Sequence, residues 1–227
     1  MYSELRFPGL TELLDRYHGL ALLPTRGDGT VIAGELEFTA TDAIGDHAVT
    51  ETFMIELLVP AKYPRLVPAV REIAGRIPRS FHTNPDSTLC LGSPLRILIR
   101  MNARPSLIGF VEGCVVPFLY GFVRHERGEG LPFGDLTHGI PGLLDDYKSL
   151  LGVTDDYSCV GMVRMLGLKR RVANKQLCPC GSGARLGRCH HRRLNRLRSL
   201  APRAWFQKEA AELARGLSTV SATPRRP

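Results

Sequence analysis

The stretch from Ile32 to Val59, IAGELEFTATDAIGDHAVTETFMIELLV, carries the strongest indication of a fold in this chain. Apolar and polar residues alternate along 32–40 and again along 53–59, and a period of two is typical of a strand with one buried face. The segment between them, DAIGDHAV, has the turn-forming residues of a hairpin loop. We therefore predict two antiparallel strands joined by a hairpin.

The segments that flank this pair predict further elements of one domain. Residues 10–19 place apolar side chains at helical spacing, which predicts a short amphipathic helix. A third strand is expected around 69–73, after prolines that forbid a helix. Ser106 is expected to cap a helix with one apolar stripe, and Pro117 is expected to kink or end it.

Beyond that helix, GEGLPFGDLTHGIPG has the composition of a loop. A helix through Leu143 and Leu150 and another from Cys159 to Leu168 are predicted to follow it. Helix, strands, long loop and helices in this order indicate an α+β fold with an antiparallel sheet flanked by helices, not an alternation of strands and helices.

Composition and charge limit the class of protein. The 227 residues have the composition of an ordinary globular chain, without an apolar leader at the start or an apolar run of the length that a membrane span needs. We expect a cytoplasmic protein that does not enter a membrane. The net charge is +8, but residues 168–227 alone carry 15 Lys and Arg against 2 Asp and Glu. The chain is thus an acidic body with a basic tail.

Four candidate metal ligands gather in the segment CPCGSGARLGRCHH, namely Cys178, Cys180, Cys189 and His190. Three thiolates and an imidazole are a ligand set that tetrahedral Zn²⁺ takes in closed structural sites. His191 is an alternative fourth ligand. So few residues cannot form a hydrophobic core, so the segment is expected to fold by binding the metal, as a structural and not a catalytic site.

The spacing C-x-C-x8-C-H with Ser-Gly after the second cysteine resembles the SEC-C motif, a zinc-binding tail. The resemblance covers about residues 174–191 and implies a small zinc-knuckle appendage. The basic tail that follows is expected to form two helices separated at Pro202, with Trp205 and Phe206 packed on the knuckle or stacked on bases. Its charge suits an acidic protein surface or nucleic acid, and a merely solvated basic helix is an equal alternative.

Cys90, in the loop HTNPDSTLCLG, is a candidate nucleophile because reactive thiols lie in accessible polar loops. The amide of Asn84 in the same loop is a candidate oxyanion donor, whereas His82 can equally satisfy backbone groups. The apolar surroundings of Cys114 and Cys159 predict small buried side chains instead.

A wider pattern includes this loop. Several features together resemble a ubiquitin-conjugating enzyme. They are the first helix, the strand pair, a P-x-x-Y-P-x-x-x-P-x-V segment from Pro60 to Val70, H-x-N followed by C-L, and Pro105-Ser106-Leu107 at a helix start. The resemblance covers roughly residues 5–125. By residue pattern the chain looks like one of the divergent bacterial members of that family, some of which work in antiphage defence. The resemblance implies the UBC fold.

The resemblance also implies roles for particular residues. Cys90 corresponds to the cysteine that carries a ubiquitin-like protein as a thioester, Asn84 to the asparagine that stabilises the oxyanion during transfer to an amine, and His82 to a mainly structural histidine. An activating enzyme, a ubiquitin-like protein and a target protein are the implied partners. Asp135 and His138 are further candidates that could assist deprotonation of the incoming amine.

Two other functions fit the residues. Cys90 with Asp135 and either His82 or His138 could form a cysteine hydrolase that removes ubiquitin-like tails. A noncatalytic UBC-shaped module that docks through its zinc and basic tail is the third possibility. We expect four segments: a conjugating-like domain at 1–152, a helical linker at 153–173, the zinc motif at 174–191, and a basic helical tail with a disordered end at 192–227.

Overall fold

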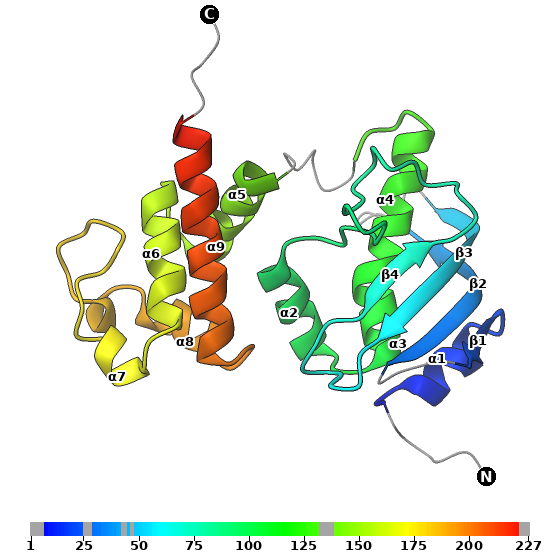
Figure 1. The fold of residues 1–227 in the computed structure, drawn as a ribbon, viewed down its shortest axis with the longest axis horizontal. Coiled ribbons are helices and arrows are strands. Elements are labelled where there is room, and N and C mark those ends of the chain that lie inside the picture. Colours follow the sequence, from blue (N-terminus) through cyan, green and yellow to red (C-terminus); the bar gives the residue numbers. More distant parts are fainter. Residues whose placement is uncertain (1–6, 25–28, 42–44, 46–47, 132–138, 223–227) are drawn as a thin grey trace, which may run out of the picture. The chain divides into compact units, whose positions relative to one another are not determined.

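The computed structural model describes residues 7–24, 29–41, 45, 48–131 and 139–222, with side chains to residue 219. The fold is α+β, with a four-stranded antiparallel sheet flanked by helices (Figure 1). The chain divides into two compact units, Met1–Asp135 and Leu136–Pro227. The helix that begins at Gly139 lies in the second unit, although sequence analysis placed it in the first domain, because it packs on helices from the C-terminal part.

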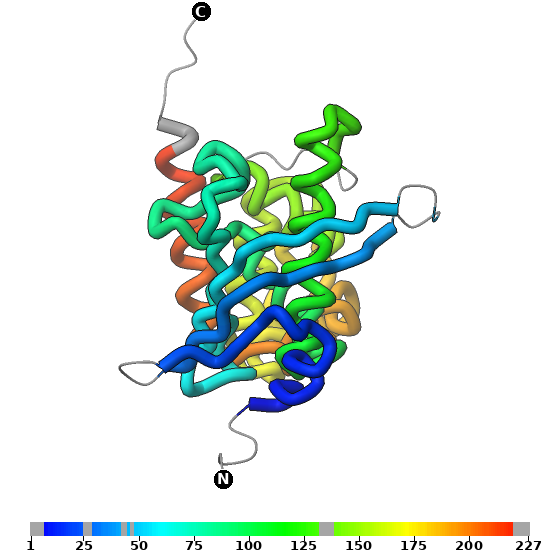
Figure 2. The backbone as a smooth tube through the Cα atoms, turned by 90° about the vertical axis from the view of Figure 1, so that its right-hand side faces the viewer, coloured from blue at the N-terminus to red at the C-terminus, as the bar shows by residue number. Residues whose placement is uncertain are grey.

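The sheet of unit 1 has the strand order β1(Leu20–Leu23), β2(Thr30–Ala40), β3(Val49–Val59) and β4(Ala69–Glu72), and each neighbouring pair is antiparallel (Figure 2). The predicted hairpin and third strand are confirmed. The short edge strand β1 was not predicted, since four residues offer too little alternation for a pattern.

Alternation along β2 and β3 buries one face of the sheet, as predicted. Leu36 of β2 pairs with Phe53 of β3, and both are at most 2 % exposed. At Gly34 the sheet has no room for a side chain, because a Cβ there would lie 2.0 Å from the Gly19 carbonyl oxygen at a φ of +138°. Glycine at this position allows β1 to approach β2.

The helices of unit 1 share one hydrophobic core with the buried face of the sheet. They are α1(Leu10–Arg16), α2(Pro94–Ala103), α3(Leu107–Phe110) and α4(Val116–Glu126), with a π-helical segment η1(Val111–Val115) between the last two. The cap by Ser106 is confirmed, since its hydroxyl accepts a hydrogen bond from the Gly109 N–H. The first helix ends three residues before the predicted position.

Pro117 does not end the helix. The chain stays helical from Leu107 to Glu126, and the π-helical segment ends two residues before the proline. Because proline lacks an N–H, it cannot continue the regular ladder, and a wider turn is a known way to accommodate the loss. These 20 residues are long and apolar enough to cross a membrane, but 61 % of the most apolar window is buried, which fits a core helix.

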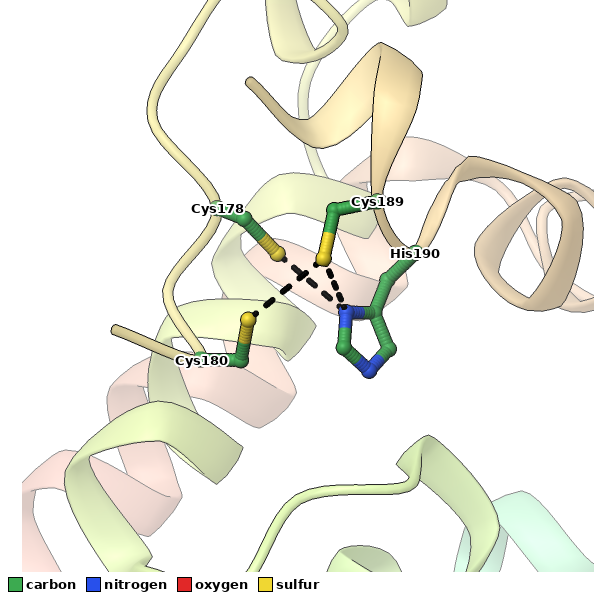
Figure 3. A group of neighbouring side chains, drawn as sticks. All are labelled: Cys178, Cys180, Cys189 and His190. Atoms are coloured by element: carbon green, nitrogen blue, oxygen red, sulfur yellow. Dashed lines mark hydrogen bonds between the residues drawn. The ribbon is translucent and has the colours of Figure 1, made fainter. Parts of the chain in front are cut away.

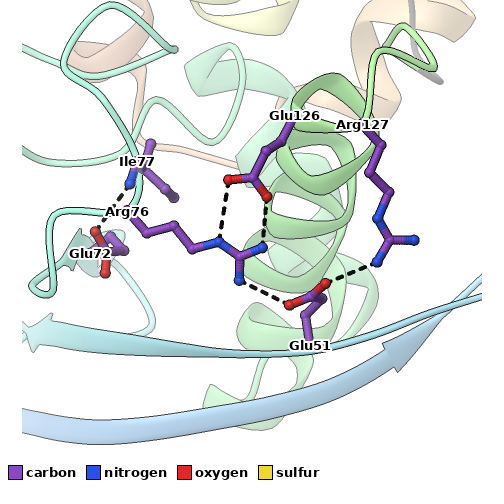
Figure 4. Close-up of polar contacts among 6 residues, drawn as sticks. All are labelled: Glu51, Glu72, Arg76, Ile77, Glu126 and Arg127. Carbon is purple, nitrogen blue, oxygen red and sulfur yellow. Dashed lines mark hydrogen bonds and ion pairs between the residues drawn. The ribbon is translucent and has the colours of Figure 1, made fainter.

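A network of charged side chains connects the segment after β4 to the rest of unit 1 (Figure 4). The Arg76 guanidinium donates to Glu51 of β3 at 2.9 Å and to Glu126 of α4 at 2.7 Å. Arg127 donates to the second oxygen of Glu51 at 2.9 Å. Arg76 also lies 4.4 Å from the centroid of the Phe53 ring. The network therefore fixes the start of the segment that leads to Cys90.

Unit 2 is helical. Its elements are α5(Gly139–Leu151), α6(Asp156–Leu166), α7(Arg170–Ala173), η2(Leu186–Arg188), α8(His191–Leu197) and α9(Arg203–Ala222). Helix α6 packs along α9 (Figure 1), and the buried Tyr147 hydroxyl of α5 donates to Glu209 of α9 at 2.7 Å. Phe206 is 1 % exposed, so this aromatic side chain packs in the core of unit 2.

Candidate metal centre and the Cys90 loop

The local fold of the zinc segment follows from its glycines. Gly181 and Gly183 adopt φ angles of 75° and 72°, a region that residues with a Cβ rarely occupy. These two turns reverse the chain, and the Cys178 N–H then donates to the Ala184 carbonyl at 2.8 Å. The reversal allows the two halves of the motif to face one another.

The four predicted ligands converge (Figure 3). The His190 Nδ1 atom lies 3.3 Å from Cys178 Sγ and 3.1 Å from Cys189 Sγ, and Cys189 Sγ lies 3.6 Å from Cys180 Sγ. All four ligand atoms are within 4.8 Å of one another. Zinc bonds of about 2.0 to 2.3 Å in a tetrahedron place ligand atoms about 3.3 to 3.8 Å apart. The side chains therefore fit a zinc ion.

The cysteines differ in electrostatic environment. Hydrogen bonding with Ser182 lowers the pKa of Cys180 to about 6, whereas burial raises the pKa of Cys178 to about 12. Ser182 Oγ also lies 3.5 Å from Cys189 Sγ. A divalent cation deprotonates coordinating thiols outright, so the buried Cys178 depends most on the metal to carry a negative charge.

His190, and not His191, is the fourth ligand, because His191 lies outside the cluster. The Nδ1 atom of His190 faces the sulfurs, and its Nε2 atom lies 3.2 Å from the carbonyl oxygen of Gly152. An Nε2–H that donates to this carbonyl leaves Nδ1 free to bind the ion. The partner carbonyl follows α5, far from the motif in sequence.

Helix α8 begins directly after the ligands and caps α5. The Arg193 guanidinium donates to the carbonyl oxygens of Ser149 and Leu150, at 3.3 and 3.4 Å. The last carbonyls of a helix have no partner within it, so cations bind there favourably. Together, His190 and Arg193 complete the C-terminal end of α5.

Arg198, which follows α8, does the same for α6. Its side chain donates at 2.8 to 3.0 Å to three carbonyl oxygens, those of Met165, Leu166 and Leu168. Burial lowers the pKa of Arg198, with a further contribution from Arg170. The segment that follows the metal ligands thus terminates two core helices of unit 2.

Helix α6 also supports the zinc loop directly. The buried Ser158 hydroxyl donates to the Pro179 carbonyl at 2.7 Å. A Cβ at Gly161 would lie 2.7 Å from the Pro179 Cβ, so the glycine makes room for the loop. The knuckle is therefore an integrated part of unit 2 and more than an appendage.

Cys90 lies in the segment between β4 and α2. It is exposed, whereas Cys114 and Cys159 are 0 % exposed, which confirms the prediction for these two. Burial raises the pKa of both buried thiols, that of Cys159 to about 12. The Cys90 N–H donates to the His82 carbonyl at 2.7 Å, and the Leu89 N–H donates to Val70 of β4 at 2.7 Å.

Asn84 is exposed in the same loop, and its side chain begins a chain of hydrogen bonds. The amide Nδ2 donates to Thr88 Oγ1 at 3.0 Å, and Thr88 Oγ1 donates to Asp86 Oδ1 at 2.7 Å. Hydrogen bonds from Thr88 lower the pKa of Asp86. Sequence analysis missed Thr88 and Asp86, although an Asp two residues before a Thr is a common turn motif.

The remaining predicted site residues are His82, Asp135 and His138, and the structure describes only the first. His82 has a φ of 35°, and its ring packs edge-on against Phe81 at 5.0 Å between centroids, in line with a structural part. Asp135 and His138 lie outside the described residues, as does the predicted disordered end. The backbone hydrogen bond from the Cys90 N–H brings Cys90 to His82, and Asn84 lies in the same loop with its side chain bonded to Thr88.

The ligand cluster of unit 2 indicates a class of site. The cluster of three cysteines and one histidine has the ligand set of a closed structural metal site and is compatible with a zinc ion. Residues 175–192 match the family model of the SEC-C motif. No curated protein and no solved structure matches the chain. The zinc-binding interpretation of the C-terminal segment thus has independent support, and the UBC resemblance of unit 1 rests on its residue pattern.

Proposed function

We propose that unit 1 carries a ubiquitin-like protein as a thioester on Cys90 and transfers it to an amine. The observation that carries this proposal is the position of Cys90: an exposed thiol in a segment whose backbone is bonded to the sheet through Leu89 and to His82. A nucleophile must be accessible and fixed in place, and both properties are present. The four-stranded antiparallel sheet with helices on one face is compatible with the UBC fold that the residue pattern implies.

In the first step the Cys90 thiolate attacks the carbonyl carbon of a thioester between the ubiquitin-like C-terminus and an activating enzyme. The bond from that carbon to the enzyme's sulfur breaks, and the departing thiolate takes up the proton that Cys90 released. One thioester is exchanged for another, so no oxidant or nucleotide is consumed in this step.

In the second step an amine attacks the Cys90 thioester. Negative charge develops on the carbonyl oxygen, the C–S bond then breaks, and an amide and the free Cys90 thiol remain. The second N–H of the Asn84 amide is the proposed donor to the oxyanion, since Thr88 engages the first. Asp135 and His138 remain candidates for assisting loss of the amine proton.

Unit 2 has a separate part in this proposal. Its four metal ligands leave no coordination position open, so the metal supplies structure and no Lewis-acid step. We propose that it docks the carrier on a partner. A noncatalytic binding module is the competing function, and it requires no reaction at Cys90.

An intact-mass measurement tests the carrier function. Tagged full-length protein and the Cys90→Ala variant are isolated from the native host without reductant and weighed before and after thiol treatment. We expect a thiol-labile adduct with the mass of a small protein on the wild type alone. Asn84→Ala is the matched variant, and it should keep the adduct but discharge it to amines more slowly.

The competing functions give different results. Equal bare masses for wild type and Cys90→Ala, with candidate activating enzymes expressed, would support the binding module. Cleavage of a linear ubiquitin-like fusion without an activating enzyme, lost in Cys90→Ala, would indicate the hydrolase.

A further inference from the structure

The charge of unit 2 is concentrated in one continuous part of the sequence. From residue 157 to residue 208 there is no Asp or Glu, whereas Lys and Arg recur throughout. This stretch includes most of α6, α7, the zinc loop and α8. Arginine predominates over lysine, and its planar guanidinium is suited to paired contacts with phosphate.

The arginines of the α8 region fall into two groups. Arg193 and Arg198 are bound to the ends of α5 and α6 through backbone carbonyls. Arg192 and Arg196 lie four residues apart, which places them on one helix face, and both are exposed. Among the described residues, neither side chain has a hydrogen bond or an ion pair.

Four more exposed arginines have side chains without a hydrogen bond or an ion pair among the described residues. We define the arginine band as Arg192 and Arg196 together with the following residues: Arg170, Arg171, Arg185 and Arg188. Backbone hydrogen bonds connect its parts, because the Gly187 N–H donates to the Asn174 carbonyl after α7, and η2 leads through the metal ligands into α8. No carboxylate of the described residues pairs with any member of the band.

We infer that the arginine band binds the phosphate backbone of nucleic acid. Six exposed guanidiniums that no carboxylate of the described residues pairs with, in a stretch of sequence without Asp or Glu, have the single sign that a phosphate backbone requires. Interfaces between proteins place charged groups mainly at the rim around an apolar centre, whereas the arginine band consists of charged side chains. The α8 region is held against the ends of α5 and α6 by Arg193 and Arg198, so its exposed arginines are positioned before binding, which lowers the entropic cost of binding.

This inference is independent of Cys90 chemistry. The contacts are to phosphates, so binding is expected to show little preference for base sequence and a steep dependence on salt. Such a surface would bring unit 1 to targets assembled on nucleic acid.

Fluorescence anisotropy tests the inference. The probe is a random-sequence DNA duplex of about 20 base pairs, titrated with zinc-loaded full-length protein from about 50 to 200 mM salt. We expect affinity in the micromolar range that falls steeply with salt. The double variant Arg192→Ala with Arg196→Ala should bind about tenfold more weakly and with a salt slope smaller by about 2.

Controls separate binding from folding and from simple loss of charge. Arg65→Ala with Arg79→Ala removes the same charge from exposed positions of unit 1 and should bind like the wild type, as should Cys90→Ala. Unchanged zinc content checks that unit 2 is folded, and Arg170→Ala with Arg171→Ala is a second test if the first variant loses zinc.

Three results would overturn the inference. They are absence of binding at the lowest salt, equal loss of affinity in the band and control variants, and displacement of the duplex by polyglutamate at matched charge concentration. The last result would assign the band to an acidic protein.

Discussion

The Cys90 loop and the zinc loop are both irregular segments rich in turn residues, but different interactions hold them. In the Cys90 loop the bonds of the Asn84, Thr88 and Asp86 side chains stay within five residues of sequence. In the zinc loop the four ligand atoms lie within 4.8 Å of one another, and His190 bonds to a carbonyl 38 residues away. The side-chain hydrogen bonds of the first loop are therefore local, whereas those of the second reach a distant helix and its ligands are arranged for a metal.

The largest effect is expected from removal of the metal. Cys189→Ser, or chelation of the wild type, should abolish zinc binding and unfold much of unit 2, because metal binding supplies about 10 kcal/mol or more to such sites. Elemental analysis and the helical circular dichroism signal measure this loss. Cys90→Ser is the matched control and should keep both. Retention of one zinc per chain by Cys189→Ser would contradict the ligand assignment.

The next effect tests whether α8 connects the metal centre to the helical core. Arg198→Ala leaves three carbonyls of the α6 end without their donor and should cost about 2 to 4 kcal/mol of unfolding free energy. The neighbouring Arg192→Ala, exposed and unbonded, should cost less than about 0.5 kcal/mol. Urea unfolding followed by the fluorescence of Trp205, the single tryptophan, measures both. Equal costs for the two variants would show that the hydrogen bonds of Arg198 to the end of α6 do not stabilise the fold.

A smaller effect is expected in the Cys90 loop. Thr88→Val removes the hydroxyl between Asn84 and Asp86 at a position that is 7 % exposed, and should destabilise unit 1 by about 1 to 2 kcal/mol. Thr52→Val, on the exposed face of β3, is the control and should be near neutral. Calorimetry that resolves the two units would detect the difference. A shift of the unit 2 transition would contradict the local character of this loop.

The smallest effect concerns pH. The Arg76 hydrogen bond, and then that of Arg127, holds the pKa of Glu51 below its usual value of 4.5. A lowered pKa means that the ionised form stabilises the folded state above the unfolded pKa, and that this contribution is lost as pH falls through the folded pKa. Glu51→Gln should therefore cost less than about 1 kcal/mol at pH 7, and this cost should vanish once the pH has fallen below the folded pKa of Glu51. A cost that does not vary with pH would exclude the ion pairs as its source.

The features that sequence predicted are those with short-range causes. Alternation in β2 and β3 requires only a period of two, and the Ser106 cap requires a bond to Gly109. The ligand set was predictable because thiols and an imidazole at this spacing have few other uses.

The features that sequence did not predict depend on distant partners. Neither the carbonyl of Gly152 nor the bonds of Arg198 leave a pattern near the ligands, because backbone acceptors carry no residue identity. Pro117 was predicted to kink or end its helix, and the π-helical segment by which the helix continues was not predicted, since such a turn has no simple sequence rule.

The contact between His190 and Gly152 has a consequence for the boundaries of the motif. The family match spans residues 175–192, yet the acceptor that orients the imidazole lies upstream of this range. A transplant of the matched residues onto another chain would carry all four ligands without that acceptor. The unit that can be moved as a working module is the span from α5 to α9, because α9 packs on both α5 and α6, and engineered fusions should begin no later than Gly139.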